Sequence, residues 1–121
     1  MTPADQAKYK ALYIQTSRQY LDKIDQALLE LLENDQLNDE TLKELFIAAH
    51  SLSGQSRVIG YNYIGEYAAL IQKNIEEKVT LDTSILQLIQ NGITRVAESI
   101  EAIEKDDKEL DLTEEINKLK L

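Results

Sequence analysis

One histidine, His50, is the residue of this 121-residue chain whose chemistry stands out. Imidazole changes its protonation near neutral pH, and its ring nitrogen can act as a nucleophile toward phosphorus. The chain contains no cysteine, which removes disulfides, thiolate nucleophiles and cysteine-ligated metal sites. What His50 can do therefore depends on which face of its segment carries the ring.

Length and composition predict a single helical domain over residues 1–121. The chain is 43% hydrophobic and 29% charged, with only 4 glycines and 1 proline, which is typical of a helical protein with one core. No apolar run approaches the roughly 20 residues of a membrane span, and no secretion signal opens the chain, so we expect a cytoplasmic location. A net charge of -9 argues against binding nucleic acid or anionic membranes and favours protein partners.

Hydrophobic periodicity predicts five helices, without strands or internal repeats. The expected N-caps are Thr2, Asn38, Asn62 and Asp82, and Gly60 is the expected left-handed end of the second helix. The four longer helices should span about 3–33, 39–59, 63–78 and 83–105, and a short fifth about 112–120. Such short connections predict an antiparallel up-down four-helix bundle with the fifth helix on its flank, an all-α fold.

Each long helix carries one apolar stripe, which we assign to the core. In the first helix the stripe comprises Tyr9, Tyr13, Thr16, Tyr20, Ile24, Ala27, Leu28 and Leu31. In the second it comprises Leu42, Leu45, Phe46, Ala49, Leu52, Ser56 and Ile59. We interpret the tyrosines of the first helix as core residues and not as binding residues.

His50 lies about 120° away from the stripe of its helix, at about 100° per residue, and so outside the core. Four residues at -7, -3, +4 and +7 share its face: Lys43, Ile47, Gly54 and Arg57. A glycine inside a helix costs about 1 kcal/mol relative to alanine, so Gly54 suggests that something approaches the backbone beside the ring. The face is basic at both ends, apolar beside the imidazole and open at the glycine.

The third helix offers a possible partner for the imidazole. Beside its core stripe lie two small residues, Gly65 and Ala69, followed by Gln72, whose amide can form a hydrogen bond with a ring nitrogen. Close helix packing explains the two small residues equally well, with Gln72 solvated.

Residues 48–54, Ala-Ala-His-Ser-Leu-Ser-Gly, resemble the histidine-phosphotransfer (HPt) domain, and in particular the P1 domain of CheA-type chemotaxis histidine kinases. The likeness covers nearly the whole chain, from the long capped first helix to the turn at 60–62 and the fifth helix. In the family pattern the histidine is followed by lysine at +3, glycine at +4, and glutamate or glutamine about 22 residues on. Here these positions are His50, Ser53, Gly54 and Gln72.

The resemblance implies a phosphorelay. His50 would accept a phosphoryl group on Nε2 from an ATP-dependent kinase domain and pass it to the aspartate of a receiver domain. Gln72 would orient the ring by accepting a hydrogen bond from Nδ1–H, and Gly54 would leave access to it. Ser53 offers the phosphoryl group a neutral hydroxyl where the family has lysine, so Arg57, with Lys43 or Lys73, is the candidate replacement cation; Arg57 as a plain solvated residue has equal weight.

Partners would dock on the face formed by Lys43, Ile47, Gly54 and Arg57. The chain has no P-loop and no glycine-rich phosphate loop, so ATP and Mg²⁺ are expected on the partner domains and no cofactor or metal on this one. The isolated domain should be a monomer, either free-standing or the first domain of a longer CheA-like kinase.

Three alternatives remain open. The first is a degenerate HPt-like bundle that docks signalling partners without being phosphorylated, which the serine at 53 motivates. The second is a di-iron bundle enzyme, which needs Glu-x-x-His pairs that one histidine cannot supply. The third is a purely structural bundle, which a buried His50 or a distant Gln72 would favour.

Overall fold

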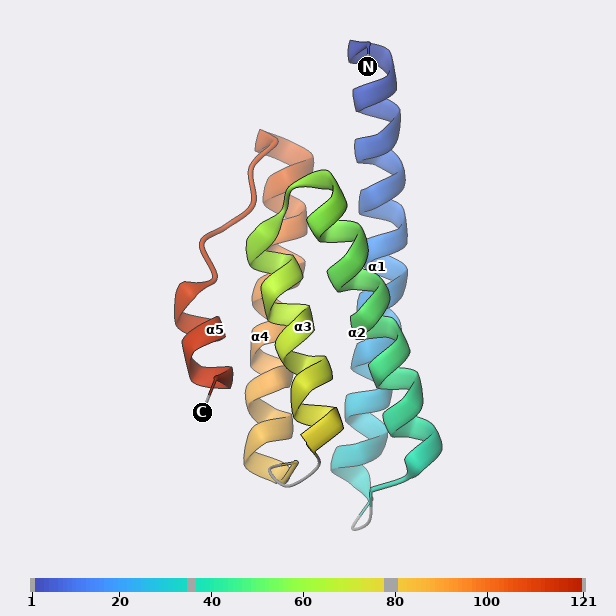
Figure 1. The fold of residues 1–121 in the computed structure, drawn as a ribbon, viewed down its shortest axis with the longest axis vertical. Coiled ribbons are helices and arrows are strands. Elements are labelled where there is room, and N and C mark those ends of the chain that lie inside the picture. The colour runs from blue at the N-terminus through green and yellow to red at the C-terminus, as the bar shows by residue number, and fades with distance from the viewer. Residues whose placement is uncertain (1, 35–36, 78–80, 121) are drawn as a thin grey trace.

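The computed structural model describes residues 2–34, 37–77 and 81–120, and these ranges contain helices and connecting segments but no strand. Five helices follow one another: α1 (Pro3–Glu33), α2 (Asp39–Ile59), α3 (Asn62–Glu77), α4 (Thr83–Asp106) and α5 (Thr113–Leu119). The first four run antiparallel to their neighbours and form an up-down bundle, and α5 lies along the flank formed by α3 and α4 (Figure 1). The predicted all-α bundle with a short fifth helix is confirmed.

Local capping explains most of the helix boundaries. Thr2 and Asp5 form a reciprocal capping box at the start of α1, and the side chains of Asn38 and Asp82 accept backbone N–H bonds at the starts of α2 and α4. Gly60 ends α2 with a φ of 101°, a left-handed conformation that costs a glycine no steric strain. These boundaries agree with the sequence-based expectations.

The start of α3 differs from the prediction. Asn62 is the first helical residue and not the cap, because the carbonyl of Tyr61 already accepts the N–H of Gly65. The carboxylate of Glu109, from the segment between α4 and α5, instead accepts the backbone N–H groups of Tyr63 and Ile64, each at 3.2 Å. A residue distant in sequence therefore completes this helix end.

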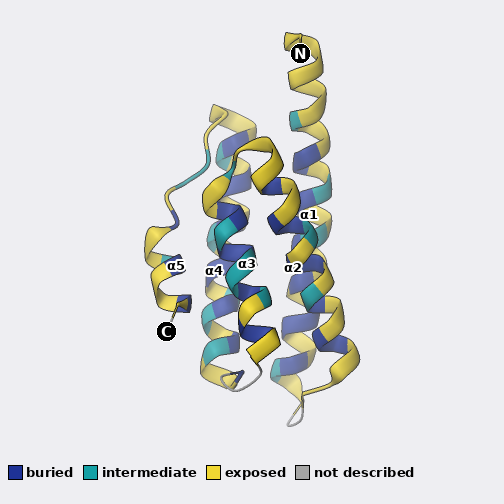
Figure 2. Ribbon diagram, viewed as in Figure 1, coloured by how far each residue is buried: buried dark blue, intermediate teal, exposed yellow. Residues whose placement is uncertain are grey.

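The core lies between the four long helices, whose buried residues face one another (Figure 2). Most stripe residues of α1 and α2 are buried, but Phe46, Thr16 and Tyr20 are half-buried and Ile59 is exposed. Tyr9, predicted to be a core residue, is 56% exposed.

A difference in helix length explains the exposure of Tyr9. The helix α1 has 31 residues and α2 has 21, and the end of α1 lies beside the start of α2, where Glu30 accepts a hydrogen bond from Thr41. At 1.5 Å per residue, α1 extends about 15 Å past α2. Its first turns accordingly project beyond the other helices (Figure 1).

Candidate functional site around His50

His50 lies on the solvent-facing side of α2 and is exposed, while the preceding Ala48 and Ala49 are buried. One helical turn earlier, the half-buried ring of Phe46 lies parallel to the imidazole, with an interplanar angle of 4° and 6.3 Å between ring centroids. The small buried alanines let α2 pack closely on its neighbours, and the phase of the helix turns the imidazole outward.

The side chain of Gln72 comes from α3 to meet the imidazole. Its Nε2 atom lies 3.0 Å from Nδ1 of His50. With the amide in this orientation Gln72 donates and Nδ1 accepts, which is the reverse of the direction expected from the sequence. A half-turn of the amide brings Oε1 to the same place and reverses the direction of the hydrogen bond.

The two glycines near the site have different surroundings. A Cβ atom added at Gly54 would meet nothing within 4 Å, so no contact inside the domain requires a glycine there. A Cβ atom at Gly65 would lie 2.6 Å from Cγ of Arg57 and 3.3 Å from the carbonyl oxygen of Ser53. Close packing of α2 on α3 thus accounts for Gly65, whereas Gly54 leaves open space beside the imidazole.

Ser53 occupies a different environment from the one expected. Its side chain is 5% exposed, and its hydroxyl donates a 2.9 Å hydrogen bond to the carbonyl of Gly65. The hydroxyl group of Ser53 therefore connects α2 to α3. It points away from the solvent to which Nε2 of His50 must be exposed. The structure does not bring Ser53 together with the exposed residues of the His50 face.

The cations near His50 are exposed. Arg57, Lys43 and Lys73 all lie at the surface, and none has an ion pair within the described ranges 2–34, 37–77 and 81–120. The aliphatic part of Arg57 lies over Gly65, on the α3 side of His50. Ile47, on the α1 side, is half-exposed as expected.

On the other side of His50 lies an open groove between α1 and α2 that the sequence analysis did not identify. Its lining includes His50 and Gly54 together with exposed apolar side chains of both helices. These are Tyr9, Leu12, Val58 and Ile59. The sequence did contain one indication of this groove. The helical phase of Val58, eight residues after His50, places this large apolar side chain outside the core stripe.

Neither a metal cluster nor a membrane-spanning helix is found where the structure describes the chain. Across those ranges, no group of three or more histidine, cysteine or acidic side chains could hold a metal ion. No helix in the same ranges is long and apolar enough to cross a bilayer.

Comparison with known proteins relates the chain to one family. The family model described as "Hpt domain" matches residues 8–106. The chain is 24% identical over 110 residues to a chemotaxis protein CheA of Halobacterium salinarum, which covers 91% of this chain but only 16% of that protein. No solved structure matches the chain significantly.

Proposed function

The chain belongs to the Hpt domain family of two-component signalling, and from this premise we propose that Nε2 of His50 receives and passes on a phosphoryl group. The observation that carries the proposal is the exposed imidazole of His50 with Gln72 against its Nδ1 atom. One ring nitrogen is engaged inside the domain, and the other is available to a partner.

The two transfers balance as nucleophilic displacements at phosphorus. The Nε2 lone pair attacks the γ-phosphorus of ATP held by a kinase domain, an N–P bond forms, and ADP leaves with the bridging oxygen. The ring keeps its proton on Nδ1, and after a half-turn of the amide Oε1 of Gln72 accepts a hydrogen bond from Nδ1–H. A receiver carboxylate then attacks the phosphorus, and the N–P bond breaks to return the neutral ring.

The charges around the ring suit this intermediate. A phosphoryl group on His50 adds negative charge to the surface, and guanidinium or ammonium groups within reach stabilise it. Arg57 is the best suited, because its planar guanidinium group can form two hydrogen bonds to phosphoryl oxygens. No carboxylate of the described residues forms an ion pair with it. Lys43 and Lys73 would add to the field, whereas Ser53 is directed to the backbone of α3.

We assign ATP and Mg²⁺ to the partners, a histidine-kinase catalytic domain and a response-regulator receiver. The chain spans about a sixth of the length of the CheA relative. A relay that draws on ATP and a receiver would operate in the cytoplasm. Within it, this domain presents the nucleophile and the contact surface.

The test is phosphorylation of the purified domain by an active CheA-type kinase domain and radiolabelled ATP. We expect an acid-labile, base-stable label on wild type and none on His50→Gln, which has similar size but no nucleophilic ring nitrogen. Label that survives His50→Gln would refute the assignment of the phosphoacceptor.

The absence of an exposed lysine at position 53 favours one alternative, a module that docks partners without taking phosphate. This alternative predicts that no kinase domain transfers radiolabelled phosphate to wild type, although receiver domains still bind. The same reaction followed by a receiver-binding measurement separates the two functions.

A further inference from the structure

We infer that the first turns of α1 are a conformational switch that responds to ionic strength, held in order by an ionic clasp at the end of α4. The clasp consists of Lys10 and Arg18 of α1 with Glu104 and Asp107. The inference goes beyond the proposed function, because it concerns the order of residues 3–12 and does not depend on a phosphoryl group.

The first turns of α1 have little apolar support. Residues 3–9 are exposed, and the first buried side chain of the helix belongs to Tyr13. Among the described residues, Lys10 is the only one before Tyr13 that forms a hydrogen bond or ion pair with the rest of the bundle. A helix end without tertiary contacts frays easily, so the order of these turns depends on Lys10.

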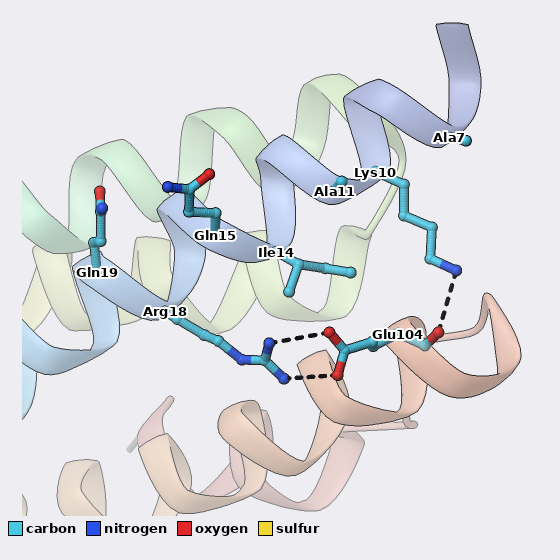
Figure 3. A pocket seen from close by; sticks show the side chains of 8 residues that line it. All are labelled: Ala7, Lys10, Ala11, Ile14, Gln15, Arg18, Gln19 and Glu104. Atoms are coloured by element: carbon cyan, nitrogen blue, oxygen red, sulfur yellow. Dashed lines mark hydrogen bonds and ion pairs between the residues drawn. The ribbon is translucent and has the colours of Figure 1, made fainter. Parts of the chain in front are cut away.

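The side of α1 that faces α4 carries ionic contacts at this level instead of a packed apolar seam. A groove of about 640 Å³ lies between the two helices, and α1 lines it with the small side chains of Ala7 and Ala11 (Figure 3). Arg18 reaches α4 and forms a two-pronged ion pair with the carboxylate of Glu104, with both N–O distances at 3.1 Å (Figure 3). Electrostatic attraction therefore holds this part of α1 to α4.

Lys10 acts as a C-terminal cap for α4. Its ammonium group donates a hydrogen bond to the backbone carbonyl of Glu104 at 3.4 Å (Figure 3) and pairs with the carboxylate of Asp107. The last carbonyl groups of a helix lack partners within the helix, and the helix dipole favours a cation beside them. One side chain of α1 thus completes the end of α4, and in return α4 holds the first turns of α1.

The clasp is both strong enough to matter and open to salt. The hydrogen bonds between Arg18 and Glu104 raise the pKa of the guanidinium group and lower the pKa of the carboxyl group, so both groups stay charged. A two-pronged pair within a group of several charges is the arrangement in which an exposed ion pair contributes measurably. Both side chains are about half exposed, so dissolved ions reach the pair and screen it.

The turns that the clasp orders border the His50 site. Gln6, Tyr9 and Leu12 line one side of the groove between α1 and α2, and His50 and Gly54 line the other. With the clasp closed, this wall of the groove is in place. When salt weakens the clasp, the wall frays and the groove opens on the α1 side. Ionic strength therefore sets how much of the time the surface beside the imidazole is complete.

The experiment is millisecond hydrogen–deuterium exchange of the whole chain at pH 7, in about 0.1 M and about 1 M sodium chloride. The Debye length falls from about 10 Å to about 3 Å between these concentrations. The variant is Glu104→Gln, which removes a charge from α4 and leaves the sequence and the helix propensity of α1 unchanged. A free peptide of residues 3–12 gives the intrinsic exchange rates in each salt solution.

Glu98→Gln is the matched control on the same helix. The side chain of Glu98 is 51% exposed and that of Glu104 is 49% exposed, so the two substitutions remove equally accessible charges. Glu98 pairs with Arg95, whose other partner is Glu115 of α5, and so it takes no part in the clasp.

At 0.1 M salt we expect residues 3–12 to exchange about threefold faster in Glu104→Gln than in wild type, and less than about 1.5-fold faster in Glu98→Gln. The higher salt concentration should accelerate the same residues of wild type by a similar factor and those of Glu104→Gln by less. Equal exchange in the two variants would overturn the inference, as would a wild type that does not respond to salt. An acceleration spread evenly over all helices would also overturn it, because the pair would then stabilise the whole fold.

A second variant, Lys10→Met, tests the cap of α4. Methionine has similar length and helix propensity but can neither pair with Asp107 nor donate to the carbonyl of Glu104. We expect residues 3–12 of this variant to exchange at least threefold faster than in wild type. Exchange at the wild-type rate would overturn the inference. Circular dichroism checks that each variant keeps the helical content of the wild-type bundle.

Discussion

The side-chain amide of Gln72 contacts Nδ1 of His50 at 3.0 Å, so a residue of α3 engages the exposed ring of α2. A carboxylate in this place would only accept a hydrogen bond, whereas an amide can donate or accept after a half-turn. The neutral amide thus serves both tautomers of the free ring. Once Nε2 of His50 carries the phosphoryl group, a protonated Nδ1 requires the amide orientation in which Oε1 of Gln72 accepts the hydrogen bond.

Replacing Gln72 by leucine should slow phosphorylation of His50 by about tenfold. Leucine has similar bulk but cannot hydrogen bond, and one hydrogen bond of about 1 to 1.5 kcal/mol corresponds to that change in rate. The initial rate of labelling by the kinase domain measures the effect. Gln72→Glu, which can still accept from Nδ1–H, is the control and should retain more activity than Gln72→Leu; equal rates for the two would remove the positioning role.

Gly54→Ala should stabilise the domain by about 0.5 to 1 kcal/mol and slow transfer between His50 and the receiver. The new methyl group meets nothing inside the domain, and alanine loses less conformational entropy in a helix. The same methyl narrows the open space beside the imidazole. Urea unfolding and the rate of phosphoryl transfer measure the two effects; a variant that is stabilised but transfers at the wild-type rate would show that Gly54 does not provide access.

Gly92→Ala is the contrasting control for stability. Its Cβ atom would lie 1.8 Å from the hydroxyl oxygen of Tyr67, a buried residue that cannot move freely. Overpacking of this kind costs about 1 to 3 kcal/mol. The two alanine substitutions should therefore change the free energy of unfolding in opposite directions.

Arg57→Gln should reduce the phosphorylation rate or shorten the lifetime of the phosphorylated histidine several-fold, with little effect on stability. The guanidinium is exposed and free of ion pairs with the described residues, so its charge is available to the phosphoryl group. Rates of labelling and of label loss in buffer measure the effect.

Ser53→Ala is expected to behave in the opposite way. Loss of its hydroxyl leaves the carbonyl of Gly65 without that donor and should cost about 1 kcal/mol of stability, with the lifetime of the phosphorylated histidine unchanged. If Ser53→Ala shortened that lifetime as much as Arg57→Gln, the serine would take part in stabilising the phosphoryl group.

Properties set by helix phase and local capping could be predicted from the sequence. The exposure of His50 follows from the 3.6-residue period of α2, and the caps at Thr2, Asn38 and Asp82 follow from side chains that bond within three residues. The contact between His50 and Gln72 crosses two helices; the phase of α3 left it as one of two possibilities, and the family pattern made it the expected one.

Contacts that depend on how the helices pack could not be predicted in this way. Ser53 shares the polar character of surface residues, yet its hydroxyl is buried against α3. Tyr9 has the spacing of a core residue, but no neighbouring helix extends far enough to cover it. The space that Gly92 leaves is filled by Tyr67 from another helix, and nothing in the local sequence of either residue indicates the other.

Glu109, in the segment between α4 and α5, should contribute to the pH dependence of stability. Burial raises the pKa of this carboxyl, against the opposing effect of the backbone N–H groups that it accepts at the start of α3. Because the folded pKa lies above the unfolded one, the folded state binds more protons between the two values. The free energy of unfolding contributed by Glu109 should thus fall as pH rises through the window just above the ordinary glutamate range.

The measurement compares urea unfolding of wild type and Glu109→Gln from pH 4 to 7. Glutamine keeps an acceptor oxygen for α3 but does not titrate, so wild type should lose stability relative to the variant as pH rises. A relative stability that is constant or increases with pH would contradict the assignment. Glu109→Ala removes the acceptor altogether and should be about 1 kcal/mol less stable than Glu109→Gln at every pH, as after the loss of a helix cap, because the N–H groups of Tyr63 and Ile64 then lack that partner and neither variant titrates at this position.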